Sequence, residues 1–338
     1  MPPPYFKNFF GLFDNPFNPS VLPEAGDAPA MLVTLPLILY EHPELHSLYS
    51  DDAGPFRQHE EDFRQELELN GYSPVGPSAG TQSYIFLIAG PEGSGKTTLM
   101  SAMVEWLERC RPQSGEVWKR FDGFQFLKNK NDPTFEQQEE SLNTIADKMS
   151  KETQLGEYCC LIVDDYLAGI ELRALDIWDQ FKVSRKIALF LTPAKGQSTD
   201  KLVQNSSHEI HLYHTSEIDP DQALAFVRTR IDAYRDLQCF NCQAHLPLFP
   251  FADHGIKDAV KAGVFEGVAA AGSITIRQLG KTLSTFLVRE AKNHLKSDKS
   301  FNIAGVPCPS LEKHLIDPSS AYDGLMQAFA RPSSGSGL

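Results

Sequence analysis

The residues best suited to chemistry form a glycine-rich run, Gly-Pro-Glu-Gly-Ser-Gly-Lys-Thr, at positions 90–97. Two glycines separated by four residues and followed by Lys-Thr match the phosphate-binding loop pattern. Glycines let the backbone curl so that successive N–H groups face an anion, and the following helix adds the positive end of its dipole. A chance glycine-rich turn is the alternative interpretation. The expected nucleotide-binding residues are Gly90, Pro91, Glu92, Gly93, Ser94, Gly95, Lys96, Thr97 and Thr98.

Lys96 is expected to reach the β- and γ-phosphates, and the Thr97 hydroxyl is expected to ligate Mg²⁺. The metal also needs a carboxylate at the end of an adjacent buried strand. The apolar run at 159–163 ends in Asp164 and Asp165. We expect Asp164 to hold Mg²⁺ through water and Asp165 to act on the attacking water. An acid pair after a strand can also cap the next helix, but coupling with the loop favours the catalytic role.

Two further polar residues are candidates for contacts with the phosphates. Thr192 follows the apolar run at 187–191, where a hydroxyl could orient water or touch the γ-phosphate; an ordinary strand-ending turn explains it nearly as well. Arg277 begins a helical pattern far downstream and could reach the nucleotide, with a solvated helix residue as the alternative.

The elements that must position these residues alternate between strands and helices. Short apolar runs predict strands at 84–89, 158–163, 187–191 and 209–213, and the loop leads into a helix at 96–110. Strands alternating with helices predict an α/β fold with a parallel sheet. The expected organisation is a Phe- and Pro-rich extension at 1–80 with one helix at 58–70, a core at 81–218, an α-helical domain at 219–330 and a tail at 331–338.

The loop, the acid pair, the strand ending in Thr192 and the helical domain carrying Arg277 together resemble the AAA+ branch of P-loop NTPases over residues 84–295. The opening residues 5–12 and 15–17 are also similar to the leader of bacterial AAA+ ATPases linked to secretion and transposition. The resemblance implies ATP rather than GTP, a sheet of strand order 5-1-4-3-2, and nucleotide bound between the core and a helical lid. It gives Thr192 and Arg277 the two sensor roles of the family.

The sequence departs from AAA+ proteins in two respects. Asp165 stands where many such ATPases carry a glutamate, and its shorter side chain predicts slow hydrolysis or dependence on a partner. The segment 194–208, which in AAA+ rings commonly supplies an arginine to the neighbouring subunit, has none. Arg173 and Arg185 are possible substitutes. The absence shifts weight toward the related STAND ATPases, which use nucleotide chiefly as a switch.

A second cluster of possible ligands lies downstream of the core. Cys239 and Cys242 have the spacing of a zinc half-site, with His245 beside them and His254 as a candidate fourth ligand. Packed, reduced cysteines are the favoured interpretation.

Composition narrows the remaining classes. The chain has 338 residues with 41% hydrophobic and 22% charged, enough for folded domains of ordinary size. A net charge of -13 disfavours general nucleic-acid binding, no apolar run is long enough to span a membrane, and the six cysteines do not suggest a disulfide framework. No secretory leader pattern is present, so a cytoplasmic protein is expected.

The sequence therefore predicts an Mg²⁺-dependent ATPase that couples nucleotide state to a conformational change and to a protein partner, with nucleotide-dependent self-association as a further expectation. The Phe-rich N-terminal segment is a candidate docking surface. Two alternatives stay open: a nucleotide-dependent switch without turnover, and an AAA+ loader on DNA, which the acidic balance makes the least favoured.

Overall fold

The structure is a computed structural model and describes residues 12, 15–17, 57–75, 79–80, 82–110, 118–127, 132–194, 196–197, 199–234, 251, 253–263 and 272–297. The chain divides into two compact units. One comprises Phe56–Ser216, and the other comprises Glu217–Leu338 together with Met1–Pro55.

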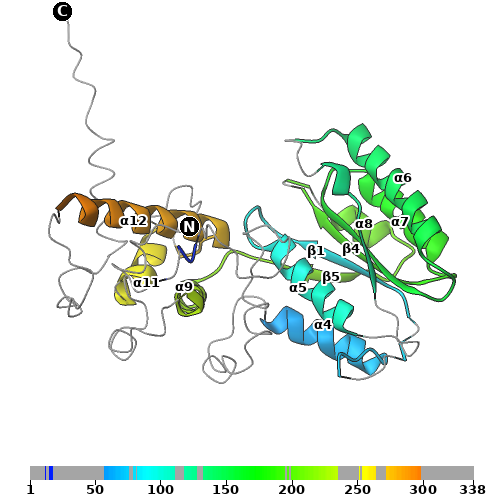
Figure 1. The fold of residues 1–338 in the computed structure, drawn as a ribbon, viewed down its shortest axis with the longest axis horizontal. Helices are drawn as coiled ribbons and strands as arrows, with labels where there is room; N and C mark the ends of the chain where they lie inside the picture. Colours follow the sequence, from blue (N-terminus) through cyan, green and yellow to red (C-terminus); the bar gives the residue numbers. More distant parts are fainter. Residues whose placement is uncertain are drawn as a thin grey trace, which may run out of the picture. The chain divides into compact units, whose positions relative to one another are not determined.

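The first unit is an α/β domain built on a five-stranded parallel sheet (Figure 1). The α/β class and the parallel sheet predicted from the sequence are thereby confirmed. The strands lie in the order β2-β3-β4-β1-β5. In chain order the elements are α4 (Arg57–Leu69), β1 (Tyr84–Ala89), α5 (Lys96–Arg109), β2 (Lys119–Asp122), the 3₁₀ turn η2 (Gln125–Leu127), α6 (Phe135–Glu152), β3 (Tyr158–Tyr166), α7 (Ile170–Phe181), β4 (Lys186–Pro193), α8 (Asp200–Asn205) and β5 (His211–His214).

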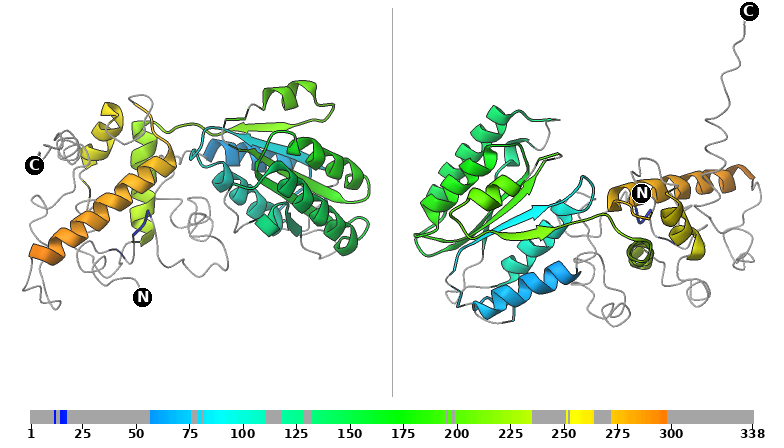
Figure 2. Two further views of the ribbon diagram at one scale, coloured as in Figure 1. Left: turned by 90° about the horizontal axis from the view of Figure 1, so that it is seen from above. Right: turned by 180° about the vertical axis from the view of Figure 1, so that it is seen from behind.

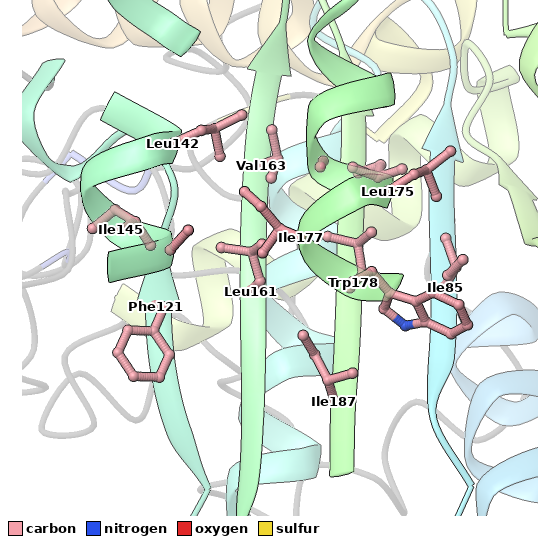
Figure 3. Close-up of a cluster of buried hydrophobic side chains, with 14 of the residues drawn as sticks. Ile85, Phe121, Leu142, Ile145, Leu161, Val163, Leu175, Ile177, Trp178 and Ile187 are labelled. Atoms are coloured by element: carbon pink, nitrogen blue, oxygen red, sulfur yellow. The ribbon is translucent and has the colours of Figure 1, made fainter. Parts of the chain in front are cut away.

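Helices cover both faces of this sheet, and side chains that alternate along each strand pack against them. Ile85 and Leu87 of β1 join the core beneath α6 and α7, part of which is drawn in Figure 3. Phe86 points the other way, where its ring lies 5.1 Å from that of Phe63 in α4. Phe63 also contacts Trp106 of α5. Figure 2 shows α6 and α7 in green on one side of the sheet and α4 and α5 in blue and cyan on the other.

The second unit is helical in its described part. It contains α9 (Pro220–Tyr234), α11 (Asp253–Ala262) and α12 (Ile276–Ser297). Apolar side chains of all three helices form one buried cluster, which includes Phe226, Ile256 and Leu283. A two-residue antiparallel bridge between Ile218 and Ile274 ties the segment before α9 to the segment before α12.

The division of the chain differs from the expected one at its N-terminus. Residues 1–80 were expected to form one extension, but α4 belongs to the α/β unit because Phe63 and Leu67 are buried there. Leu12, in contrast, is fully buried in the helical unit, and the Phe17 ring packs against Phe226. These parts of the expected docking surface are therefore occupied within the chain. Phe6, Phe9, Phe10 and Phe13, like the tail at 331–338, lie outside the described residues.

Two other features of the elements bear on function. Strand β2 was not predicted, because its sequence Lys-Arg-Phe-Asp has one apolar residue, Phe121. Its last residue, Asp122, thereby lies at the carboxyl end of the sheet, where β1 and β3 also end. In the described part of the chain, no helix combines the length and apolarity that crossing a membrane requires.

Candidate functional site

The glycine-rich loop, residues 90–97, connects β1 to α5 in the strand–loop–helix arrangement that its sequence predicted. Gly90, Gly93 and Gly95 have positive φ of 149°, 79° and 98°. Gly95 is the residue before α5, and its left-handed conformation turns the chain into the helix. A Cβ on Gly90 would lie 2.2 Å from the Thr215 hydroxyl oxygen, so no other residue fits there. The backbone geometry therefore requires glycine at these two positions.

Polar contacts hold the loop in a closed curve. The hydroxyl of Ser94, which is fully buried, donates to the Pro91 carbonyl oxygen at 2.7 Å. The Lys96 ammonium donates to the carbonyl oxygens of Gly90 at 3.1 Å and Pro91 at 3.3 Å. Lys96 thus folds back over the loop that precedes it. A cation held against a curved glycine-rich backbone is suited to binding an anion.

The acid pair at the end of β3 meets the loop through hydroxyl groups. Thr97, in the first turn of α5, donates its hydroxyl to Asp164 at 2.9 Å from Oδ2 and 3.1 Å from Oδ1. Thr192, fully buried in β4, also donates to Asp164 Oδ1. Two sequence-predicted hydroxyl groups, from α5 and β4, therefore converge on the Asp164 carboxylate at the end of β3. The structure thus brings Thr97, Asp164 and Thr192 together.

A β-bulge aims the two aspartates in different directions. The pairing of β3 with β4 shifts register between Val163 and Tyr166, so that β3 carries one more residue than its partner. Asp165 lies in this irregular stretch with φ of 60°, a conformation uncommon for residues other than glycine. Its backbone N–H donates to the Thr192 hydroxyl at 2.8 Å, and its side chain is exposed. Asp164 points into the hydroxyl cluster while Asp165 remains open to solvent.

Burial raises the pKa of the Asp164 carboxyl above its usual range. The hydrogen bonds from Thr192 and Thr97 oppose this shift, and the nearby charges of Asp165 and Asp122 add to it. Burial thus disfavours the charged form of Asp164 by more than its two hydroxyl donors favour it. A cation near Asp164 would lower its pKa.

The Thr97 hydroxyl and the Asp164 carboxylate suit Mg²⁺, which binds oxygen ligands. In phosphate-binding loops, Mg²⁺ usually takes only one or two protein ligands and completes its shell with phosphate oxygens and water. Among the described residues, no group of three or more His, Cys, Asp or Glu side chains forms a metal site. Thr97 and Asp164 supply two oxygen ligands of the kind that Mg²⁺ takes from a protein.

The sequence analysis did not identify the residues of α6 that hydrogen-bond to the backbone around the acid pair and β2. Gln138 of α6 is 2% exposed; its amide nitrogen donates to the Asp165 carbonyl oxygen at 3.2 Å, and its amide oxygen accepts from the Leu167 N–H at 2.9 Å. One turn later, the Ser141 hydroxyl donates to the Gly123 carbonyl oxygen at 2.7 Å, just after β2. Gln138 lies in the acidic stretch 136–140, which is typical of a solvated helix face. A glutamine among acids gave no signal of burial.

The other predicted residues are less central in the structure. Pro91 and Glu92 are exposed, and Thr98 is half-buried in the first turn of α5. Arg277 is exposed in the first turn of α12, in the helical unit. The cysteines of the possible zinc half-site, Cys239 and Cys242, lie outside the described residues together with His245, and so does the side chain of His254.

No protein family model matches this sequence, and no curated protein matches it at a significant level.

Proposed function

We propose that this chain is an Mg²⁺-dependent ATPase of the P-loop type. The observation that carries the proposal is the hydrogen bond from Thr97 to Asp164, at 2.9 Å, beside a glycine-rich loop in which Gly90 leaves no room for a Cβ. The two oxygen groups expected to share a metal come from α5 and β3 and are adjacent. A glycine-rich turn that arose by chance would have no reason to place its threonine against a buried carboxylate.

Each group of the loop has a distinct task in this proposal. The backbone N–H groups of residues 93–97 and the start of α5 bind the phosphates, and Lys96 adds a positive charge. Thr97 and Asp164 hold Mg²⁺, which when bound neutralises charge on the β- and γ-phosphates. Pro91 and Glu92 shape the loop through their backbone.

Hydrolysis transfers the γ-phosphoryl group of ATP to water. As the water oxygen bonds to the γ-phosphorus, the bond from that phosphorus to the β-phosphate oxygen breaks, giving ADP and phosphate. Asp165 accepts the proton that the water loses. Its exposed carboxylate can reach a water molecule, whereas the Asp164 carboxylate is engaged by Thr97 and Thr192. Thr192 positions both aspartates because it bonds one side chain and the other's backbone.

The architecture supports an AAA+-type protein within the P-loop class. Read from β5, the strand order is 5-1-4-3-2, the order that the sequence resemblance implies. Along the chain, a helical unit comes directly after the α/β unit, and Arg277 lies in the first turn of its helix α12.

A nucleotide-dependent switch with negligible turnover is the second candidate, and two observations favour it. Asp165 is one methylene shorter than the glutamate usual at this place. The two arginines considered as trans-acting groups have contacts within the chain: Arg173 donates to Asn143 at 2.7 Å, and Arg185 donates to the Thr153 carbonyl oxygen at 2.8 Å. If the chain is such a switch, ATP binding alone changes its affinity for a protein partner or for a second copy of the chain.

Steady-state phosphate release, measured beside nucleotide binding, separates the two candidates. For an ATPase, Asp165→Asn lowers turnover by about 10²–10⁴-fold while ATP affinity is retained. Asparagine tolerates the positive φ at this position, so the variant tests the carboxylate rather than the backbone. Asp176→Asn, in an exposed part of α7, is the matched control and leaves turnover unchanged.

Tight ATP binding by the unmodified chain without phosphate release would instead establish the switch. Mass measurement of the assembly with and without MgATP then tests nucleotide-dependent self-association. Salt-sensitive, ATP-dependent DNA binding would instead support the third hypothesis, a loader on DNA.

A further inference from the structure

Asp122 lies at the carboxyl end of the sheet, beside the strand that carries the acid pair, and has no task in the proposed function. It is the last residue of β2. Parallel pairing places its Cα opposite that of Ile162, two residues before Asp164 in β3. The Asp122 side chain is half-buried. Its carboxylate therefore adds negative charge beside the candidate metal site.

The alternation of side chains along β2 places Asp122 on the face of the sheet that α5 covers. Phe121 points to the opposite face, where it joins the core beneath α6 and α7. Burial raises the pKa of Glu108 in α5, and the positive charge of Arg120 opposes this shift, so Arg120 lies on the α5 side. Asp122, two residues after Arg120, shares that side with the Thr97 hydroxyl in the first turn of α5.

Hydrogen bonds fix the chain directly after Asp122 and orient its carboxylate. The Phe124 N–H donates to Asp122 Oδ1 at 3.0 Å. The Gly123 N–H donates to the Ile162 carbonyl oxygen at 2.7 Å, and the Gly123 carbonyl oxygen accepts from the Ser141 hydroxyl of α6 at 2.7 Å. Asp122 is therefore held in place by β3, by α6 and by the turn that follows it.

The charge of Asp122 acts on the carboxyl group of Asp164. Burial is the main cause that raises the pKa of Asp164, and the negative charges of Asp165 and Asp122 raise it further. Neighbouring like charges destabilise one another, whereas a cation among them stabilises all of them. Mg²⁺ keeps several water molecules when it binds with a nucleotide, and these waters donate hydrogen bonds to acceptors around the metal. A fixed carboxylate on the α5 side of the sheet is a suitable acceptor.

We propose that Asp122 is a positioning residue for the metal: its carboxylate accepts a hydrogen bond from a water molecule bound to Mg²⁺ and so strengthens metal binding. The inference rests on the proposed function, because it requires that Mg²⁺ bind with ATP at the glycine-rich loop. Asp164 and Asp122 then have different tasks. Asp164 lies against the Thr97 hydroxyl, and Asp122 acts on the metal through water. Acceptors of this kind typically contribute about 10–100-fold to metal affinity.

The Mg²⁺ dependence of ATP binding by the full chain tests this role, with calorimetric titration at a series of Mg²⁺ concentrations and in EDTA. Asp122→Asn keeps an oxygen acceptor for the Phe124 N–H but removes the charge. In this variant, the Mg²⁺ concentration that gives half of the increase in ATP affinity should rise by about 10–100-fold. In EDTA its ATP affinity should not fall, because the removed charge repels the phosphates. Asp147→Asn, at an exposed position of α6, removes the same charge elsewhere and should behave as the unmodified chain.

The outcomes separate this inference from the proposed function. An unmodified chain that binds no ATP, or binds it without regard to Mg²⁺, overturns both. Mg²⁺-dependent binding with an unchanged Mg²⁺ requirement in Asp122→Asn overturns the inference and leaves the ATP site intact. An equal loss of ATP affinity with Mg²⁺ and in EDTA also overturns it, since Asp122 would then only support the fold. If Asp122→Asn does not fold, as judged by circular dichroism, Asp122→Ser should show the same rise in Mg²⁺ requirement, and an unchanged requirement there contradicts the inference.

Discussion

The two ends of the parallel sheet are built from different kinds of residues. At the amino end, Tyr84 and Tyr158 begin their strands, and Tyr72 packs edge-on against both. Trp118 lies 5.0 Å from the Tyr158 ring, just before β2. At the carboxyl end stand the glycine-rich loop, a strained bulge and partly buried carboxylates. One end is closed by aromatic packing, and the other holds polar groups that favour a ligand.

At the aromatic end, two tyrosine hydroxyls bond to backbone carbonyls, whereas the buried Tyr84 hydroxyl and Trp118 Nε1 have no hydrogen-bond partner among the described residues. The Tyr72 hydroxyl donates to the Gln82 carbonyl oxygen at 2.5 Å, and the Tyr158 hydroxyl donates to that of Gly80. The carboxyl end instead leaves the pKa of Asp164 raised and Asp165 at positive φ. In parallel sheets, ligands bind at the carboxyl ends of the strands. In this domain, the residues that stabilise the fold and the residues of the candidate site therefore lie at opposite ends of the sheet. Substitutions at each end test this separation.

The largest effect on stability is expected at the aromatic end. Tyr72→Ala should lower the free energy of unfolding by about 3–5 kcal/mol, because a fully buried ring is lost. Tyr72→Phe keeps the ring and loses the bond to Gln82, so its cost should be about 1 kcal/mol. Denaturant unfolding measures both. MgATP affinity of the folded variants should stay unchanged; a parallel loss of affinity would show that the two ends are not separate.

The largest effect on ligand binding is expected at the loop. Lys96→Ala should weaken MgATP binding by about 10²-fold or more, since it removes the loop's charged donor. Its unfolding free energy should change by less than about 1 kcal/mol. Calorimetric titration measures the affinity. Lys281→Ala, at an exposed position of α12, is the matched control and should bind as the unmodified chain does; equal affinities in all three proteins would contradict a role for Lys96.

A smaller effect is expected beneath the acid pair. Gln138→Leu removes both hydrogen bonds to the β3 end, so Asp165 should lose its position and turnover should fall about tenfold while MgATP affinity changes little. Gln138→Glu keeps the acceptor for the Leu167 N–H, so its turnover should lie between those of Gln138→Leu and the unmodified chain. Phosphate release measures turnover, with the exposed Glu140→Gln as control. Normal turnover in Gln138→Leu would mean that α6 supports only the fold.

The smallest effect concerns pH and Asp164. Because burial raises its pKa, the folded state holds the Asp164 proton more tightly than the unfolded chain does. The contribution of this group to the free energy of unfolding is therefore lost as pH rises from the unfolded value through the folded pKa. Asp164→Asn removes this loss.

The Asp164→Asn variant should be more stable than the unmodified chain by about 0.5–2 kcal/mol at neutral pH, a size common when a functional site is relieved. The difference should shrink in acid. Thermal unfolding across this pH range measures it. A variant less stable than the unmodified chain at neutral pH would contradict the expected cost of the buried carboxylate.

Some parts of this site could be predicted from the sequence and others could not, for physical reasons. Strand β1 was predicted with its observed bounds, because a run of six buried residues between turn-forming segments has one simple interpretation. The loop was predicted because its chemistry demands fixed spacing. Gln138 was missed because its role depends on long-range hydrogen bonds, which periodicity does not encode. Leu12 was missed as a core residue of the helical unit because it packs against apolar side chains far along the chain, which periodicity does not encode either.

The bulge at the end of β3 could not be predicted either. A strand was expected to end at 163, but β3 continues through Asp164 and Asp165 to Tyr166. Two acids in succession ordinarily signal the end of a strand. Here the Thr192 hydroxyl and the Gln138 amide bond the backbone of the bulge, and so hold an extended segment that local preference disfavours.

Calorimetric titration of the full chain with ATP, in the presence and absence of Mg²⁺, tests the central claim most directly. The account predicts one ATP bound per chain, with affinity that falls when the metal is removed by a chelator and falls further in Thr97→Ala. Absence of binding by the unmodified chain, or binding that ignores both the metal and the Thr97 hydroxyl, would contradict a nucleotide site built on the loop and Asp164.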